Sequence, residues 1–247
     1  MERQEMPNSK DHRYQHTNAQ EDLLEKGAIL QRDGSYAIAP HIPGGVITDP
    51  EVLIRIAQVA QKYSCPAIKV TIAQRLAIVG LKEEDIDSAW KDLGMAPGAA
   101  IGVCVRSVKI CPGSTFCKRG QQDSIGLGME MDKRYHGMTT PSKMKISISG
   151  CPNKCTDTMV NDIGVMGTAK GFTVYVGGNG GITPRLAEKL IEHQTAEQVL
   201  HLVDQIMDYY KANAQTNERI GKFMDRVGLE EFRNHVVGDR AVHQAGE

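Results

Sequence analysis

The chain has 247 residues, of which 40% are hydrophobic, and its 29 Lys and Arg nearly balance its 30 Asp and Glu. This length allows one large domain or two small ones, and the net charge of -1 gives no general attraction to nucleic acid or to anionic membranes. No apolar run approaches the length of a membrane span, and 5% aromatic residues leave little for base stacking. We therefore expect neither a membrane protein nor a nucleic-acid-binding module.

Residues 1–26 are polar and charged and show no periodicity. This composition predicts a disordered tail, with order starting near Gly27. The segment lacks the apolar stretch of a signal peptide, so we expect a cytoplasmic protein whose cysteines stay reduced.

Residues 27–95 have the pattern of a small α+β unit. Thr48 and Glu51 fit a capping box at the start of the first helix, and Pro50 suits a first helical turn. The expected elements are a strand pair around 28–38, a helix from 51 to about 63, the strands AIKVTI and RLAIVGL, and a helix over 83–93. This order predicts a ferredoxin-like arrangement.

A linker, MAPGAA, leads into a second unit over 96–194, which begins with the strand AIGVCVRSVKI. Strict alternation along this strand predicts two faces, one with Val103, Val105 and Ser107 and the other with Cys104, Arg106 and Val108. A helix is expected near 124–135. Residues 195–247 read as C-terminal amphipathic helices and a tail, with Thr195 as the first cap.

The strand KMKISISG alternates between a polar and an apolar face. The polar face holds Lys143, Lys145, Ser147 and Ser149, and the core face holds Met144, Ile146 and Ile148. Two lysines at i and i+2 point the same way and can bring two cations to one anion. A solvated strand face is the simpler interpretation when the strand is taken alone.

Four of the six cysteines form two close pairs, Cys111-x5-Cys117 and Cys151-x3-Cys155, and each pair contains a proline. Four thiolates from two loops can hold an iron–sulfur cluster. Disulfides, inert thiols and zinc are the alternatives, although zinc sites usually have shorter and more uniform spacings. Pro152 is expected to open a helical turn that puts the second pair on one face.

The segment GFTVYVGGNGG predicts a strand that runs into a glycine-rich turn, where backbone amides can approach an anion. No G-x-G-x-x-G fingerprint follows a strand, so no nicotinamide or flavin site is expected and electrons must come from another protein. The histidines at 193, 201, 235 and 243 lack metal-ligand spacing.

Several motifs in this order resemble the siroheme and [4Fe-4S] domain of the nitrite and sulfite reductase family. They are VTIAQRLAIVGL, VRSVKICPGSTFC, TPSKMKISISGCPNKC, DIGVMG and YVGGNGG. The similarity is greatest to small assimilatory-type sulfite reductases and to the siroheme domain of NADH-dependent nitrite reductase large subunits. It implies an α+β fold, a ferredoxin-like half domain followed by a mixed α/β siroheme and iron–sulfur domain with C-terminal helices.

The resemblance also implies roles for individual residues. Cys111, Cys117, Cys151 and Cys155 match the cluster ligands, and Cys155 matches the thiolate that also binds the siroheme iron. The basic residues that match those around the oxyanion are Arg75, Arg106, Lys143 and Lys145. In larger family members the first arginine precedes the glutamine, whereas here Ala73 holds that place and Arg75 follows Gln74.

Siroheme carries many carboxylates, so its pocket needs cations and amide donors. The candidates for these contacts are Lys109, Lys118, Arg119, Lys154, Gly177, Gly178, Asn179 and Gly180. The implied reaction is the six-electron reduction of sulfite to sulfide, with nitrite to ammonia as the variant, fed by a ferredoxin or a flavoprotein. Lysines with lowered pKa values would donate protons.

Larger sulfite reductases contain two copies of this half, one with the cysteines and one with the substrate-binding cations. This chain has one copy that carries both sets, so we expect a homodimer with shared sites. A [4Fe-4S] electron-transfer protein without siroheme and a zinc-stabilised binding module are the competing hypotheses.

Overall fold

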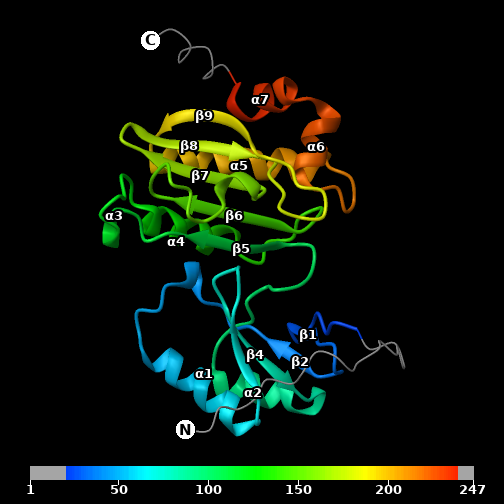
Figure 1. Cartoon of the computed structure of the whole chain (residues 1–247). Helices are drawn as coiled ribbons and strands as arrows, with labels where there is room; N and C mark the ends of the chain where they lie inside the picture. The colour runs from blue at the N-terminus through cyan, green and yellow to red at the C-terminus, as the bar shows by residue number, and fades with distance from the viewer. Residues whose placement is uncertain (1–20, 239–247) are drawn as a thin grey trace.

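The computed structural model describes residues 21–238, which form two units, one above the other in Figure 1. In the first unit the strands are β1 (Ala28–Leu30), β2 (Tyr36–Ile38), β3 (Ala67–Val70) and β4 (Leu76–Leu81). Its helices are η1 (Pro43–Gly45), α1 (Glu51–Lys62), η2 (Glu83–Asp85) and α2 (Ile86–Leu93). The strands pair antiparallel in the order β1-β2-β4-β3, and a core around Ile38, Ile78 and Ile86 joins them to the helices.

The second unit contains a five-stranded sheet in the order β5-β6-β7-β8-β9. Its strands are β5 (Val105–Ile110), β6 (Met144–Ser149), β7 (Ile163–Thr168), β8 (Gly171–Val176) and β9 (Glu188–Gln194). Its helices are α3 (Gly113–Phe116), α4 (Ser124–Tyr135), η3 (Thr158–Val160), α5 (Ala196–Asn213), α6 (Ile220–Val227) and α7 (Leu229–Val237). β5, β6 and β7 run parallel, whereas β8 and β9 add antiparallel.

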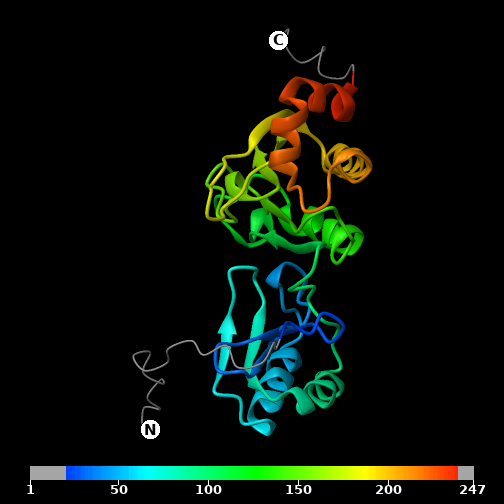
Figure 2. The same ribbon diagram turned by 90° about the vertical axis from the view of Figure 1, so that its right-hand side faces the viewer.

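Helices cover one face of this second sheet (Figures 1 and 2). The core under them takes Met144, Ile146 and Ile148 from β6, and it continues into α5, α6 and α7. The C-terminal helices therefore share one core with the strands, and the boundary expected at 194/195 does not separate two packed bodies. The α+β fold and the ferredoxin-like first half are confirmed.

Three local expectations are wrong. The first helix begins at Glu51, whose amide donates to Asp49 Oδ1 at 3.0 Å, so Glu51 is too early in the helix to form a capping box with Thr48. The disordered tail was predicted over residues 1–26. Residues 1–20 lie outside the described part, but residues 21–26 contact the first unit. Trp90 Nε1 donates to the Lys26 carbonyl at 2.7 Å, so order starts before Gly27.

The third wrong expectation is the alternation along β5. A β-bulge lies between Val105 and Ser107, so Val105 and Val108 both reach the core. Ser107 and Lys109 then share the opposite face. A bulge inserts one extra residue into a strand and reverses the pattern beyond it, which strict alternation cannot foresee.

The two units meet along a seam formed by His41, Arg75, Asp132 and His136. His41 Nε2 lies 2.8 Å from Asp132 Oδ2, and the two histidine rings stack with centroids 3.6 Å apart. Close by, the Gln74 side chain donates to the Ile110 carbonyl and accepts from the Ile110 amide, both at 2.8 Å. This pair of hydrogen bonds fixes the β3–β4 turn of the first unit to the end of β5.

Within the part of the chain that the structure describes, no helix is long and apolar enough to cross a lipid bilayer.

Candidate functional site

The two cysteine pairs begin at one edge of the second sheet. Cys111 follows β5 directly, and Cys151 stands two residues beyond the end of β6, its parallel neighbour. The amide of Gly150 donates to Cys111 Sγ at 3.0 Å. This hydrogen bond ties the loop after β6 to the first cysteine after β5.

Glycines let the two cysteine loops touch. A Cβ on Gly150 would stand 2.7 Å from Gly113 Cα, and one on Gly120 would overlap the Gly113 backbone. The amides of Gln121 and Gln122 donate to the Gly150 carbonyl at 2.8 and 3.0 Å. Backbone packing this close needs residues without side chains, and it brings the loop that holds Cys111 and Cys117 against Gly150, the residue before Cys151.

The four sulfurs differ in exposure. Cys111 and Cys151 are buried, Cys117 is half-buried and Cys155 is exposed. Over residues 21–238, no three His, Cys, Asp or Glu side chains lie close enough to share one metal ion. The donor set consists of thiols alone, a set that suits iron–sulfur clusters and structural zinc.

The second cysteine pair lies on a single hydrogen-bonded turn that begins at Cys151 and includes Pro152. The Lys154 amide donates to the Cys151 carbonyl at 3.3 Å, but Lys154 itself has a φ of 50°. Asp157 also has a positive φ, 58°. A left-handed conformation at non-glycine residues costs free energy and ends the helical turn after one step.

A cavity of about 290 Å³ opens over the polar face of β5 and β6. It is lined by Ile72, Ala73, Ser107, Lys109, Lys143, Lys145, Asp157, Val160, Asn161, Asn179, Gly180, Gly181 and Arg219. Its walls thus carry four cations and one carboxylate. Lys109 stands two residues before Cys111 and Asp157 two residues after Cys155, so the cavity adjoins the cysteine loops.

Two of these cations have acidic partners and two do not. Lys109 Nζ pairs with Asp157 at 2.9 Å, and Arg219 pairs with the buried Asp162. Lys143 and Lys145 make no ion pair with any residue in 21–238. An unpaired cation beside open space is suited to hold an anion that enters from outside.

The neighbours of Lys145 fix its backbone and lower the pKa of its side chain. Its amide donates to Asp162 Oδ2 at 2.8 Å, which fixes this point of β6. Burial lowers the pKa of Lys145 first, and the Arg219 cation lowers it further. A lysine with a lowered pKa gives up its proton more readily near neutral pH, as a general acid must.

Arg219 lines the cavity and is paired with the buried Asp162. Burial raises the pKa of Asp162, and Arg219 counteracts this with Nε 3.0 Å from Oδ1. Arg219 Nη1 also donates to Asn179 Oδ1 at 3.0 Å, and so ties the glycine-rich turn to this ion pair. Sequence reasoning missed Arg219. The aspartate of the DIGVMG motif was the available signal, but its partner lies 57 residues away.

Two buried hydroxyls on the same sheet face lack partners. Ser107 Oγ and Ser147 Oγ are both buried, and neither has a hydrogen-bond partner within residues 21–238. Buried polar groups are nearly always satisfied in native proteins. A polar sheet face with unsatisfied hydroxyls and unpaired lysines fits an additional anionic or polar group bound against it.

Five of the predicted site residues line the cavity: Lys109, Lys143, Lys145, Asn179 and Gly180. Gly177 and Gly178 are buried behind it, where a Cβ on Gly178 would stand 2.5 Å from the Asn161 carbonyl oxygen. Lys154 packs over the Tyr175 ring, with Nζ 5.7 Å from its centroid.

The structure places the remaining basic residues elsewhere. Lys118 and Arg119 are exposed after Cys117. Arg106 lies in the β5 bulge, and its side chain donates to the Gly102 carbonyl at 2.9 Å. Arg75 is buried in the seam, where desolvation lowers its pKa to about 10, and its Nη2 has no hydrogen-bond partner within residues 21–238. Ala73 lines the cavity, and Arg75 does not.

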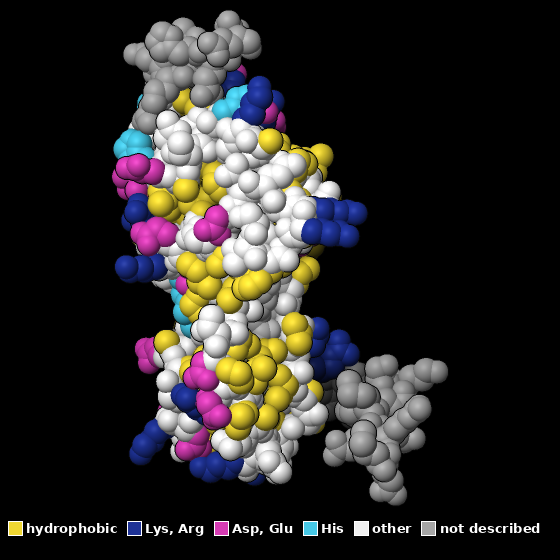
Figure 3. Space-filling model, turned by 90° about the vertical axis from the view of Figure 1, so that its left-hand side faces the viewer, with side chains coloured by type: hydrophobic (Ala, Val, Ile, Leu, Met, Phe, Trp, Pro, Cys, Tyr) yellow, Lys and Arg dark blue, Asp and Glu magenta, His cyan; other side chains and the backbone are white. Residues whose placement is uncertain are grey.

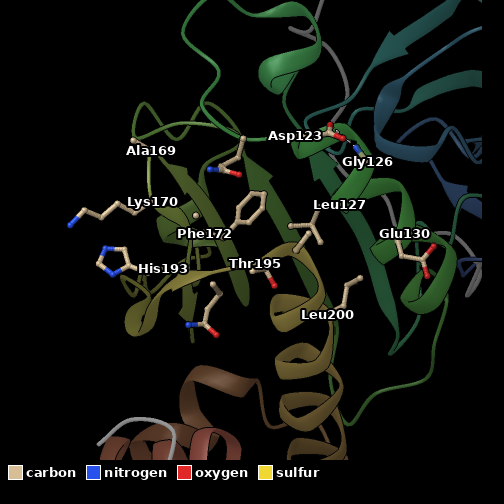
Figure 4. Close-up of a pocket in the computed structure, with 14 residues that line it drawn as sticks. Asp123, Gly126, Leu127, Glu130, Ala169, Lys170, Phe172, His193, Thr195 and Leu200 are labelled. Carbon is tan, nitrogen blue, oxygen red and sulfur yellow. Dashed lines mark hydrogen bonds between the residues drawn. The ribbon is translucent and has the colours of Figure 1, made fainter. Parts of the chain in front are cut away.

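A larger recess of about 610 Å³ lies between α4, the β7–β8 turn and the start of α5 (Figure 4). Leu127, Phe172 and Leu200 form its apolar floor, and Asp123, Glu130, Lys170 and His193 stand around it. None of the predicted catalytic residues lines it. Its position beside Gln122 nevertheless sets it next to the loop that ends at Cys117.

Two family models match the chain. Residues 29–96 match the nitrite/sulfite reductase ferredoxin-like half domain, and residues 101–244 match the nitrite and sulphite reductase 4Fe-4S domain. Together they cover both units.

Curated relatives include sulfite and nitrite reductases. The assimilatory-type sulfite reductase of Nitratidesulfovibrio vulgaris is 42% identical, over 86% of this chain and 98% of the relative. The nitrite reductase [NAD(P)H] of Bacillus subtilis is 41% identical, over 82% of this chain but 25% of the relative. The chain thus spans nearly all of the first protein and about a quarter of the second.

The fold is shared with solved structures. The crystal structure of dissimilatory sulfite reductase I superimposes with a TM-score of 0.74 at 15% identity, over 82% of this chain and 69% of that one. The Mycobacterium tuberculosis NirA protein gives a TM-score of 0.72 at 18% identity, over 81% of this chain and 39% of that one.

Proposed function

The chain belongs to the nitrite and sulphite reductase family of oxidoreductases, and on this premise we propose that it reduces sulfite to sulfide. The coverage of the relatives favours sulfite. The chain matches 98% of an assimilatory-type sulfite reductase, whereas it matches only a quarter of a nitrite reductase that carries further segments.

The observation that carries the proposal is the cation-lined cavity beside the cysteine loops. Lys143 and Lys145 would bind the oxygens of a small oxyanion, since neither is neutralised by a carboxylate ion pair. Lys145 would also donate protons as oxygen leaves as water, because its pKa is lowered. Arg219, held by Asp162, would stabilise the bound anion.

The residues present fit siroheme by their chemistry. Lys109, the backbone of Gly180 and the amide of Asn179 would bind its carboxylates, and the unsatisfied Ser107 and Ser147 hydroxyls lie on the sheet face that it would cover. When bound, siroheme would supply the iron at which the oxyanion accepts six electrons. The 290 Å³ cavity has the size of a small ligand site.

The four cysteines are the proposed ligands of a [4Fe-4S] cluster. Cys111 and Cys151 would bind from the sheet edge, and Cys117 from the end of α3. Cys155 is proposed as the thiolate shared with the siroheme iron, which agrees with its exposure and with its place two residues before the cavity residue Asp157. The six cysteines form no disulfide within residues 21–238, which is typical of a reducing compartment, and we propose that the protein is cytoplasmic.

An external protein would supply the electrons, and a ferredoxin or a flavoprotein is proposed.

We also propose a homodimer with shared sites. β3 is an edge strand, and on it Ile68 and Val70 are 41% and 66% exposed, followed by Ile72 at 80%. An apolar edge strand is a pairing surface, and Ile72 also lines the cavity. Size-exclusion chromatography with light scattering tests this, and a fully active monomer refutes it.

Absorption spectroscopy and steady-state kinetics test the function. Purified protein should show strong Soret and red bands, whereas a cluster alone would give a broad shoulder and zinc no colour. With reduced methyl viologen as the electron source, kcat/KM for sulfite should exceed that for nitrite. Absence of the Soret band, or of any oxyanion reduction, refutes the proposal.

Nitrite reduction to ammonia is the second candidate, supported by the 41% identity to a nitrite reductase. Both substrates are small anions that need the same cationic cavity. A kcat/KM for nitrite above that for sulfite would favour this candidate.

A further inference from the structure

The short helix α3 ends in an exposed aromatic residue next to a proposed cluster ligand. Phe116 is 77% exposed and directly precedes Cys117. The next two side chains, Lys118 and Arg119, are also exposed, and neither forms an ion pair with residues 21–238. We call Phe116, Lys118 and Arg119 the α3 patch.

The charge of the α3 patch is not neutralised locally. The segment CPGSTFCKRGQQ, from Cys111 to Gln122, contains no Asp or Glu. The carboxylate that follows, Asp123, is engaged in capping α4, where it accepts from the Gly126 amide at 2.9 Å. Figure 3 faces the side of the molecule on which α3 lies in Figure 1, and there Lys and Arg side chains project from both edges of the second unit.

The 610 Å³ recess adjoins this patch. The Ser114 amide donates to the Gln122 carbonyl at 3.0 Å, so α3 is bonded to the segment that forms one wall of the recess. Phe172 and Leu127 lie in the recess, and Lys170 stands at its rim with its amine directed outward (Figure 4). The surface therefore combines a projecting aromatic residue, an apolar hollow and three cations.

We propose that the α3 patch and the adjoining recess dock a small acidic electron-carrier protein. This inference rests on the proposed function, in which electrons come from outside the chain. Lys118, Arg119 and Lys170 would steer an acidic partner, and Phe116 would fill an apolar contact at the centre of the interface.

The location also suits electron transfer. A carrier bound over Phe116 would lie directly beside Cys117, a proposed cluster ligand. In each encounter the reduced carrier would give up one electron, which the proposed cluster would accept, without a bond being made or broken. The sulfite cavity stays free, because its lining includes no residue of the α3 patch.

The test measures binding and turnover separately, with a reduced plant-type [2Fe-2S] ferredoxin as the acidic probe and holoenzyme throughout. Calorimetry at several salt concentrations gives Kd, and turnover is followed with either the ferredoxin or reduced methyl viologen. The variants are F116A and the double reversal K118E/R119E. The matched control, K91E/K211E, reverses two exposed lysines, one in each unit.

We expect F116A to raise the ferredoxin Kd about tenfold and to leave viologen-driven turnover within about twofold of wild type. K118E/R119E should raise Kd by at least as much and flatten its salt dependence. A wild-type Kd in both variants overturns the proposal. An equal loss of ferredoxin binding in the control variant K91E/K211E also overturns it. Loss of siroheme absorption in K118E/R119E without weaker binding would also overturn it and return these residues to cofactor binding.

Failure of this proposal is distinguishable from failure of the proposed function. Ferredoxin binding does not require sulfite reduction, whereas the Soret band and viologen-driven reduction do not require the α3 patch.

Discussion

The cavity over β5 and β6 and the seam between the two units both bury cations, but in different surroundings. In the cavity, Lys145 is half-buried beside open space, and Arg219 is fully paired with Asp162. In the seam, Arg75 is 6% exposed and is packed against Gly98, whose added Cβ would stand 3.1 Å from Arg75 Nε.

The comparison shows that burial alone does not identify a binding site. Desolvation lowers the pKa of both Arg75 and Lys145. Only the cavity has room for an anion. It also has further cations in its walls, and a carboxylate, Asp162, that fixes the position of Lys145. The seam instead joins the units through aromatic stacking and the His41–Asp132 contact.

The largest effect is expected from K145A. Removing the proposed proton donor should lower kcat for sulfite reduction about a thousandfold, while the cofactor absorption bands remain. Steady-state kinetics with reduced methyl viologen measures this. Turnover at the wild-type rate would show that the lowered pKa of Lys145 has no catalytic use.

The next largest effect is expected from R219Q, since this change leaves the buried Asp162 without its cation. Breaking a buried ion pair costs about 3 kcal/mol of unfolding free energy, measurable by denaturant titration.

R219Q should also shift the pH profile. A lysine acts as an acid only while protonated, so activity falls above its pKa. Removing the Arg219 cation raises the pKa of Lys145, and the alkaline limb should therefore move to higher pH. R219K, which keeps the charge, should leave the limb near its wild-type position. An unmoved limb in R219Q would contradict the coupling.

R75M tests the seam side of the comparison. Because Arg75 is desolvated and its Nη2 is unsatisfied, an apolar replacement should change the unfolding free energy by less than about 1 kcal/mol. KM for sulfite should stay within about threefold of wild type, with K143A as a cavity control whose KM rises. A tenfold rise for R75M would mean that Arg75 reaches the substrate, as the resemblance implies.

The smallest effect concerns His136. Burial first, and then the neighbouring His41, lowers the pKa of His136 below its ordinary 6.5. Below pH 6.5 the unfolded chain therefore binds more protons than the folded one, and stability falls as pH falls through this range. Between pH 7.5 and 5.5 the Tm of wild type should drop about 2 °C more than that of H136Q. Equal drops would contradict the assignment.

The sequence predicted most elements because their signals are local. Thr195 caps α5 as expected, and α4 covers 124–135 as expected. The polar face of β6 follows from alternation with period two. The bulge at β5 carries no such signal, and the alternation predicted there is wrong. The positive φ angles of Lys154 and Asp157 carry no such signal either.

The candidate site was predicted in part for the same reason. Lys143 and Lys145 stand out on one strand, and the cysteine pairs stand out by their spacing. Arg219 could not be found, because its role depends on Asp162, 57 residues earlier in the chain. Arg75 and Arg106 have the residue type of the motif, yet Arg75 packs against Gly98 and Arg106 donates to the Gly102 carbonyl.

By itself the sequence determined the family, the α+β order of elements and the cysteine and lysine motifs, because residue spacing and alternation fix which side chains share a face or a loop. Only the tertiary structure decided which cations surround one cavity, which carboxylates neutralise them, and that Phe116 projects beside Cys117. Charge pairing and exposure depend on residues that are distant in the chain, and these meet only when the sheet, the C-terminal helices and the first unit have packed together.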